Sequence, residues 1–195
     1  YKRLFERARR RGLGVTVHTG ESGPIEEIGE VIRNLEPSRI GHGIKAAYDP
    51  RMMALIRERE ITLEICPTSN LNTRVVSGWE EFRWIFDTFR QNGVRYTINT
   101  DGPEMLKTYI RDELASLARH DILSVEEQEQ AAAWAREASF VPGVSGEAEV
   151  PPPRRTPARL ISLPRCAASG SSSPVSTARK RCCSCRASAT SRPWT

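Results

Sequence analysis

In this sequence of 195 residues, residues 1–149 are short of cysteine and the whole sequence is short of long apolar runs, and each shortage excludes a class of protein. Residues 1–149 contain one cysteine, Cys66, which excludes a disulfide framework there and predicts a reducing compartment, the cytoplasm. No run of about 18 apolar residues is present, so the sequence predicts no membrane-spanning helix. No Gly-x-Gly-x-x-Gly loop follows an apolar run, which leaves a dinucleotide-binding fold without its local signature.

Acidic residues are missing from residues 150–195, a segment that carries nine basic residues. The net charge of +5 therefore belongs to this segment, because residues 1–149 carry a net charge of −4. The segment also lacks hydrophobic periodicity, and its Arg/Ser/Pro/Cys composition is typical of disorder. We expect a folded region over residues 1–142 and a disordered basic tail over residues 143–195, of the kind that a shifted reading frame produces.

That basic tail is the one feature that would favour a nucleic-acid-binding protein. Such a protein would bind DNA in a salt-dependent way and would lose this binding when residues 150–195 were removed. Since the folded region is mildly acidic, we expect no nucleic-acid partner.

Short apolar runs alternate with segments of helical periodicity through the folded region. We predict strands at residues 15–17, 39–42, 61–65 and 94–98. Helices are predicted at residues 1–11, 25–35, 50–60, 80–91, 104–118 and 124–139. This alternation predicts an α/β fold of parallel βα units, in either a barrel or an open doubly wound sheet.

A cluster of polar residues follows each predicted strand. In chain order the clusters are His18-Thr19-Gly20-Glu21, Gly41-His42-Gly43, Cys66-Pro67-Thr68-Ser69-Asn70 and Thr100-Asp101-Gly102-Pro103. In a βα-barrel, the loops at the carboxyl ends of the strands carry the active site. Two histidines, a glutamate and an aspartate there would make half of a metal-dependent hydrolytic site.

Three of the clusters also have an interpretation without catalysis. Glu21 is typical of a helix start, and Asp101 is typical of a turn. Cys66 would act as a nucleophile only beside a base, and Asn70 is interpreted as a structural cap after a proline-terminated strand.

The four clusters in this order resemble the adenosine deaminase family of the metal-dependent amidohydrolase superfamily. That family reads His-Ala-Gly-Glu, Arg-Ile-Gly-His-Gly, Cys-Pro-x-Ser-Asn and Ser-Thr-Asp-Asp-Pro at the fifth to eighth strands of its barrel. The resemblance covers about residues 1–142, with Ala138-Ser139-Phe140 similar to the family's last helix. It implies part of a TIM-type (β/α)8 barrel, about strands five to eight with their helices.

The resemblance also implies a reaction, the hydrolytic deamination of adenosine or a related purine nucleoside or base by a zinc-activated hydroxide. His18 and Asp101 would be zinc ligands, and Asp101 would also hold the hydroxide. Glu21 would donate a proton to ring nitrogen N1 of the purine, and His42 would orient and deprotonate the attacking water. The implied partner is a small purine molecule, and neither a nucleic acid nor a membrane.

The sequence departs from the family pattern at two places. The family's His-x-His metal ligands on the first strand would precede Tyr1, so we expect a truncated chain that holds zinc weakly, lacks activity alone and is poorly soluble. Gly102 replaces the second aspartate, which leaves adenosine, adenine and aminodeoxyfutalosine open as substrates. Two alternatives remain: another hydrolase of the superfamily, and a catalytically dead half-barrel that acts as a binding module.

Overall fold

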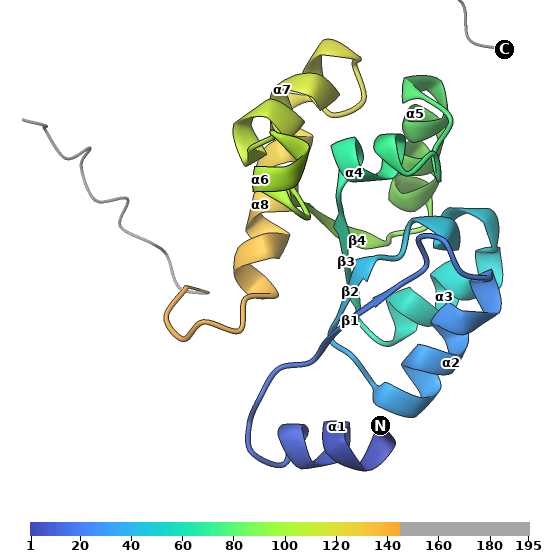
Figure 1. Ribbon diagram of the computed structural model, residues 1–195, viewed down its shortest axis with the longest axis vertical. Helices are drawn as coiled ribbons and strands as arrows, with labels where there is room; N and C mark the ends of the chain where they lie inside the picture. Colours follow the sequence, from blue (N-terminus) through green and yellow to red (C-terminus); the bar gives the residue numbers. More distant parts are fainter. Residues whose placement is uncertain (145–195) are drawn as a thin grey trace, which may run out of the picture. The chain divides into compact units, whose positions relative to one another are not determined.

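Four short parallel strands form one sheet in the order β1-β2-β3-β4 (Figure 1). Their bounds are β1 Thr16–Thr19, β2 Arg39–His42, β3 Thr62–Ile65 and β4 Arg95–Ile98. The computed structural model describes residues 1–144, so almost all of the tail predicted over residues 143–195 lies outside the described residues. The prediction of four parallel βα units is confirmed, and each strand lies within two residues of its predicted bounds.

Helices follow every strand. Their bounds are α1 Lys2–Arg9, α2 Ile25–Leu35, the 3-10 helix η1 Ile44–Tyr48, α3 Pro50–Glu58, α4 Pro67–Asn72, α5 Trp79–Gln91, α6 Pro103–Leu106, α7 Ile110–Arg119 and α8 Val125–Glu137. In Figure 1, α2, α3 and α5 lie on one side of the sheet, and α8 packs beside β4. Through residue 144, no helix combines the length and the apolar character needed to cross a bilayer.

The hydrophobic core lies between the sheet and these helices. Alternate residues of a strand face opposite sides of a sheet, and Ile40, Leu63 and Tyr96 are among the fully buried residues on this side. The Tyr96 ring packs edge-on against Phe86 of α5, with ring centroids 4.9 Å apart, and against Trp134 of α8 at 5.4 Å. Tyr96 therefore joins two helices that lie far apart in the sequence to the same strand.

Two helices begin at side-chain caps that the sequence encodes locally. Ser124 caps α8: its Oγ accepts from the Glu127 N–H at 3.3 Å, and the Glu127 carboxylate accepts from the Ser124 N–H at 2.7 Å. The Asp49 carboxylate accepts from the Arg51 N–H at 2.8 Å and caps α3.

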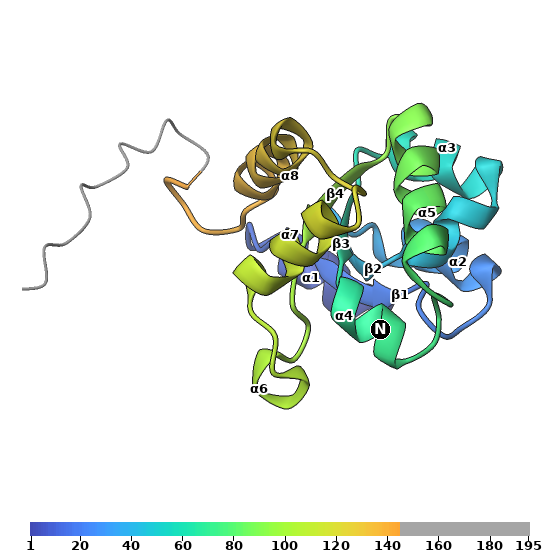
Figure 2. The ribbon, with the colours of Figure 1, turned by 90° about the horizontal axis from the view of Figure 1, so that it is seen from above.

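The single helix predicted over residues 104–118 is wrong, because the chain forms two helices, α6 and α7. Lys107 ends α6 with a left-handed backbone, φ 54°. The Asp112 carboxylate then accepts from the Tyr109 N–H at 3.0 Å, which starts a new helix. None of the residues of α6 is buried, and Figure 2 shows this short helix standing apart from the sheet.

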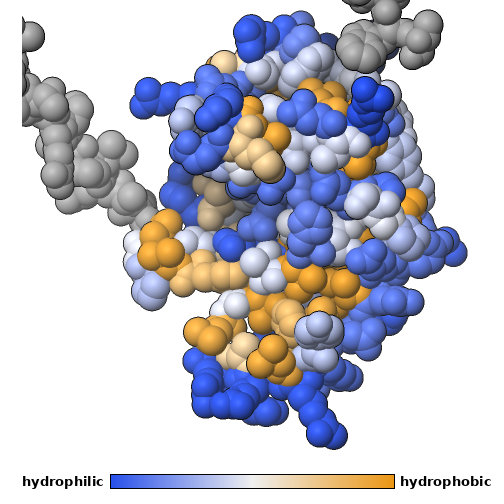
Figure 3. Space-filling model, in the orientation of Figure 1, coloured by the Kyte–Doolittle hydropathy of each residue, from blue (hydrophilic) through white to orange (hydrophobic). Residues whose placement is uncertain are grey.

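Apolar side chains remain exposed around α1 and the segment that follows α8, where they gather on the lower part of the surface in Figure 3. They include Leu4, Leu13, Phe140 and Val141. No residue of α1 is buried, so this helix adds little to the core.

Candidate active site

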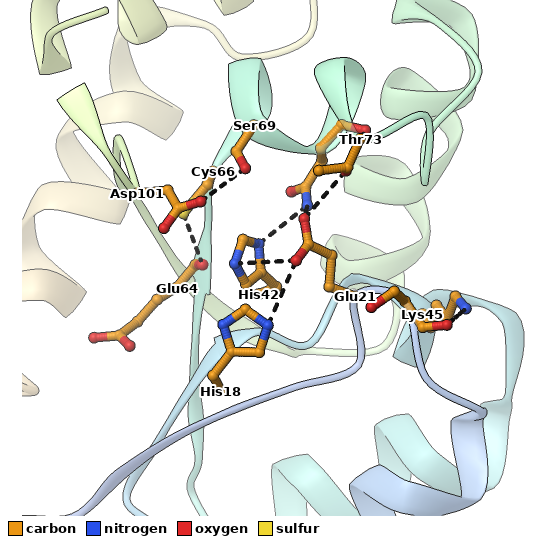
Figure 4. A network of polar contacts seen from close by, with 11 residues as sticks. His18, Glu21, His42, Lys45, Glu64, Cys66, Ser69, Thr73 and Asp101 are labelled. Atoms are coloured by element: carbon orange, nitrogen blue, oxygen red, sulfur yellow. Dashed lines mark hydrogen bonds and ion pairs between the residues drawn. The ribbon is translucent and has the colours of Figure 1, made fainter. Parts of the chain in front are cut away.

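The polar clusters predicted from the sequence meet at the carboxyl ends of the four strands (Figure 4). His18 lies on β1, and His42 is the last residue of β2. Glu21 lies in the loop after β1, and Asp101 follows β4. Because the strands are parallel and adjacent, the loops that follow them emerge at one edge of the sheet.

A sharp turn of the backbone places His42 in the site. His42 and Gly43 both adopt a left-handed conformation with φ 63°, and Gly20 opposite them has φ 73°. A Cβ added at Gly20 would lie 2.9 Å from the Cα of Gly43, so the two loops approach too closely for a side chain there. Asp101 is also left-handed, with φ 59°. Such conformations cost about 1–3 kcal/mol each for residues other than glycine and concentrate at functional sites.

His18, Glu21 and His42 form the centre of the site. Glu21 Oε2 lies 3.4 Å from His18 Nε2 and 3.6 Å from His42 Nε2. The two imidazole rings meet edge-on with centroids 4.6 Å apart. Glu21 and His42 are buried, whereas the His18 side chain is 64% exposed and faces the open side of the site.

Burial sets the charge state of His42. Removal from solvent lowers the pKa of His42 below its ordinary value of 6.5, and this outweighs the opposing effect of the Glu21 charge. At neutral pH the ring is therefore neutral and can accept a hydrogen bond at one nitrogen and donate one at the other.

Asp101 faces the same cavity but stands apart from the three central residues. The cavity has a volume of about 580 Å³ and is lined by His18, His42, Glu64, Cys66 and Asp101 among others. Ser69 Oγ donates to Asp101 Oδ2 at 2.8 Å. The nitrogen and carboxylate atoms of His18, Glu21 and His42 lie within 4.8 Å of one another, and Asp101 is outside this group.

Two side chains of the site were not predicted. Asn70 was interpreted as a structural cap, yet its Nδ2 donates to Glu21 Oε1 at 3.2 Å and lies 3.0 Å from His42 Nδ1. Thr73 Oγ1 donates to the same Glu21 oxygen at 3.1 Å. Both belong to α4 and its C-cap, a helix too short to show a periodic pattern in the sequence. Their spacing of three residues, one helical turn, was the only available signal.

A buried carboxylate holds α4 in place from the far side. Glu113 of α7 is fully buried, and its Oε2 accepts from the Thr68 N–H at 3.1 Å. Its Oε1 accepts from Thr108 Oγ1 at 3.0 Å. Glu113 thus ties the start of α4, which carries Ser69 and Asn70, to α7.

Cys66 does not have the character of a nucleophile. Burial, with smaller effects from the Asp101, Glu113 and Glu64 charges, raises the pKa of the thiol to about 12. At neutral pH it is therefore fully protonated, and its Sγ lies 3.5 Å from the carbonyl oxygen of Glu64 as a donor.

The side chains of the site are of the types that bind zinc in proteins. Imidazole nitrogen and carboxylate oxygen are ordinary zinc ligands. His18 and Asp101 are both exposed, and they line one cavity. Among residues 1–144 these donors come from the ends of β1 and β4, the two outer strands of the sheet.

Comparison with known proteins identifies close relatives of this region. The family model described as adenosine deaminase matches residues 1–148. The chain is 39% identical over 128 residues to an aminodeoxyfutalosine deaminase of Streptomyces coelicolor, covering 66% of this chain and 32% of the relative. It is 36% identical over 127 residues to an adenine deaminase of Stutzerimonas stutzeri, covering 65% of this chain and 39% of the relative.

Solved structures match in fold as well. The crystal structure of an adenine deaminase from Arthrobacter aurescens superimposes with a TM-score of 0.62 and 30% sequence identity, covering 72% of this chain and 42% of that one. The chain therefore spans well under half the length of these relatives. Because the matched structures are TIM-barrel enzymes, the prediction of a partial barrel is confirmed.

Proposed function

The chain belongs to the adenosine deaminase family, and from this premise we propose that it carries part of the active site of a zinc-dependent enzyme that deaminates a purine nucleoside or base. One observation carries the proposal: Glu21 lies between His18 and His42 at the carboxyl ends of parallel strands. The buried free thiol of Cys66 supports a cytoplasmic location.

Glu21 is the proposed proton donor to ring nitrogen N1 of the purine. Its Oε1 already accepts from Asn70 and Thr73, so Oε2 is the oxygen that faces the two histidines. Protonation of the ring nitrogen removes the negative charge that would develop when water adds to the carbon bearing the amino group. Ammonia then leaves.

His42 is proposed to orient the attacking water, and family resemblance also gives it the role of base. Its ring is almost fully buried beside Glu21, so its position is fixed. His18 and Asp101 are the residues that would hold zinc. When bound, zinc lowers the pKa of a coordinated water to about 7, which supplies a nucleophile at neutral pH.

Adenosine is the first candidate substrate, with adenine and aminodeoxyfutalosine as alternatives. The relatives named for the last two match this chain at 36% and 39% identity. A Cβ at Gly102 would have Met105 as its nearest neighbour, at 3.5 Å, which is an ordinary van der Waals contact, so this position has room for the purine-contacting aspartate of the family but lacks its side chain. Comparison of kcat/KM for adenosine, adenine and aminodeoxyfutalosine identifies the substrate.

The test fuses this chain to the N-terminal part of the Stutzerimonas stutzeri adenine deaminase, up to the residue aligned with Tyr1. We expect zinc-dependent release of ammonia from at least one of the three substrates. Glu21→Gln should lower kcat by about 10²–10⁴-fold while zinc content stays the same. Glu26→Gln, on the exposed face of α2, is the matched control and should leave kcat unchanged.

Two results would reject the proposal. Unchanged turnover in Glu21→Gln would remove Glu21 as the proton donor. A fusion that neither holds zinc nor releases ammonia would favour the alternative of a catalytically dead binding module.

A further inference from the structure

The side-chain amide of Asn70 lies between two residues of the proposed active site. Asn70 is 0% exposed. One end of its amide faces both Glu21 Oε1, at 3.2 Å, and His42 Nδ1, at 3.0 Å. Within the part of the chain that the structure describes, the other end, Oδ1, is buried and has no hydrogen-bond partner.

The partners themselves determine which end of the amide faces them. A carboxylate oxygen only accepts hydrogen bonds, and Glu21 Oε1 already accepts one from Thr73 Oγ1 at 3.1 Å. The amide end beside it must therefore be the NH2 group, because the opposite orientation would set the amide oxygen against the carboxylate oxygen. The NH2 group has two hydrogens, one for Glu21 and one for His42.

This orientation fixes the proton on the His42 ring. A neutral imidazole has one nitrogen that donates and one that accepts. Because Asn70 donates to Nδ1, Nδ1 is the acceptor and Nε2 carries the hydrogen. Nε2 is the nitrogen that lies 3.6 Å from Glu21 Oε2.

The backbone of α4 prevents the amide from moving away. The Asn70 N–H donates to the Cys66 carbonyl at 2.9 Å, and the Asn70 carbonyl accepts from the N–H groups of Val75 and Val76 at 3.1 and 3.2 Å. The start of the helix is held by Glu113 through the Thr68 N–H. The Asn70 side chain therefore reaches His42 from a fixed backbone.

We propose that Asn70 is a positioning residue that holds His42 in the tautomer with its proton on Nε2 and holds Glu21 by its Oε1. The meaning of this tautomer for catalysis rests on the proposed function. A ring with a hydrogen on Nε2 donates a hydrogen bond from that nitrogen and accepts no proton there. His42 thus orients the oxygen of the water as a donor, and its base role would require another tautomer.

The test reads the tautomer directly by two-bond ¹H–¹⁵N correlation spectra of the full chain, labelled with ¹⁵N-histidine, at about pH 8. The chain has three histidines, so the spectra of His18→Gln and His120→Gln assign the His42 signals by elimination. We expect His42 with a protonated Nε2 and an unprotonated Nδ1. Asn70→Asp should place a proton on Nδ1, because a carboxylate at this position accepts from Nδ1 and cannot donate to it.

Thr73→Val is the matched control, because it removes the other donor to Glu21 Oε1 and leaves the Asn70 contact with His42 intact. Its His42 tautomer should be that of the unaltered chain. A merely structural role for Asn70 would predict the same tautomer in Asn70→Asp as well.

A protonated Nδ1 in the unaltered chain would overturn the inference by itself, whether or not the variants fold. So would an unchanged His42 tautomer in a folded Asn70→Asp variant. These outcomes are separate from the fate of the proposed function, because the spectra need neither zinc nor turnover. A fusion enzyme without activity rejects the function and leaves the tautomer as measured.

Discussion

The two faces of the four-stranded sheet are made by the same strands, but one packs apolar side chains against helices and the other carries polar side chains. On the helix-covered face, Ile40, Leu63 and Tyr96 are fully buried. On the opposite face, Thr16 Oγ1 donates to Glu64 Oε2 at 2.9 Å, and Glu64 Oε1 pairs with Arg39 Nε at 3.1 Å. This second face borders the cavity of the candidate site.

The difference shows how four-residue strands serve two purposes. Since side chains alternate along a strand, one set of residues can bury apolar area while the next set stays polar. Stability should therefore depend on the helix-covered face, and chemistry on the cavity face and the loops beyond it. Substitutions on the two faces measure how complete this division is.

The largest expected effect comes from the helix-covered face. Phe86→Ala removes a fully buried ring that packs edge-on against Tyr96, so we expect a loss of about 3–5 kcal/mol in the free energy of unfolding. Urea unfolding followed by circular dichroism measures it. Trp84→Ala is the control on the same helix, where the Trp84 side chain is 46% exposed, and should cost about 1 kcal/mol or less. Equal losses in the two variants would mean that burial against the sheet is not what makes Phe86 stabilising.

A second prediction concerns pH and again the helix-covered face. Burial raises the pKa of Tyr96 from 10.0 to about 12, against the opposing effect of Arg90. The folded state thus favours the neutral phenol, and this contribution is fully present below pH 10. It is lost as the pH rises from about 10 to 12, by roughly 2–3 kcal/mol, because the unfolded chain releases the proton first.

Tyr96→Phe should reduce this alkaline loss of stability, to which the buried Cys66 thiol also contributes. The measurement is the urea midpoint between pH 9 and 12 for the unaltered chain and the variant. Tyr109→Phe, at an exposed tyrosine, is the control and should keep the full pH dependence. If the two variants gave the same curve, the buried phenol of Tyr96 would not be its source.

Much of the fold could be predicted, because in most helices the apolar periodicity begins and ends at the same residues as the helix-starting and helix-ending signals. The helix predicted over residues 25–35 matches α2 at both ends, where Pro24 precedes a regular apolar stripe. The division of residues 104–118 into α6 and α7 was missed because it depends on a left-handed Lys107 and a carboxylate cap from Asp112. Neither feature alters the apolar periodicity, so the sequence pattern runs on across the break.

Prediction from the sequence pattern is limited in the same way for single residues of the candidate site. His18, Glu21 and His42 could be predicted, because each directly follows an apolar run or its turn and such loops converge in a parallel sheet. The contacts of Asn70 and Thr73 could not be predicted. They depend on the six-residue helix α4 and on the hydrogen bond by which Glu113 holds its first turn. Hydrogen-bond partners 28 to 52 residues away leave no local pattern in the chain.

The smallest expected effect comes from the cavity face and compares two neighbours of nearly equal shape. Thr16→Val removes an exposed hydroxyl whose Glu64 partner is also held by Arg39, so we expect a change in unfolding free energy of under about 0.5 kcal/mol. Val15→Thr places a hydroxyl at a buried position directly before β1 and should cost about 1–3 kcal/mol. Both values come from urea unfolding at one pH. A cost for Thr16→Val as large as that for Val15→Thr would mean that the cavity face also stabilises the fold, because a hydrogen bond at its edge would then be worth as much as a buried apolar contact.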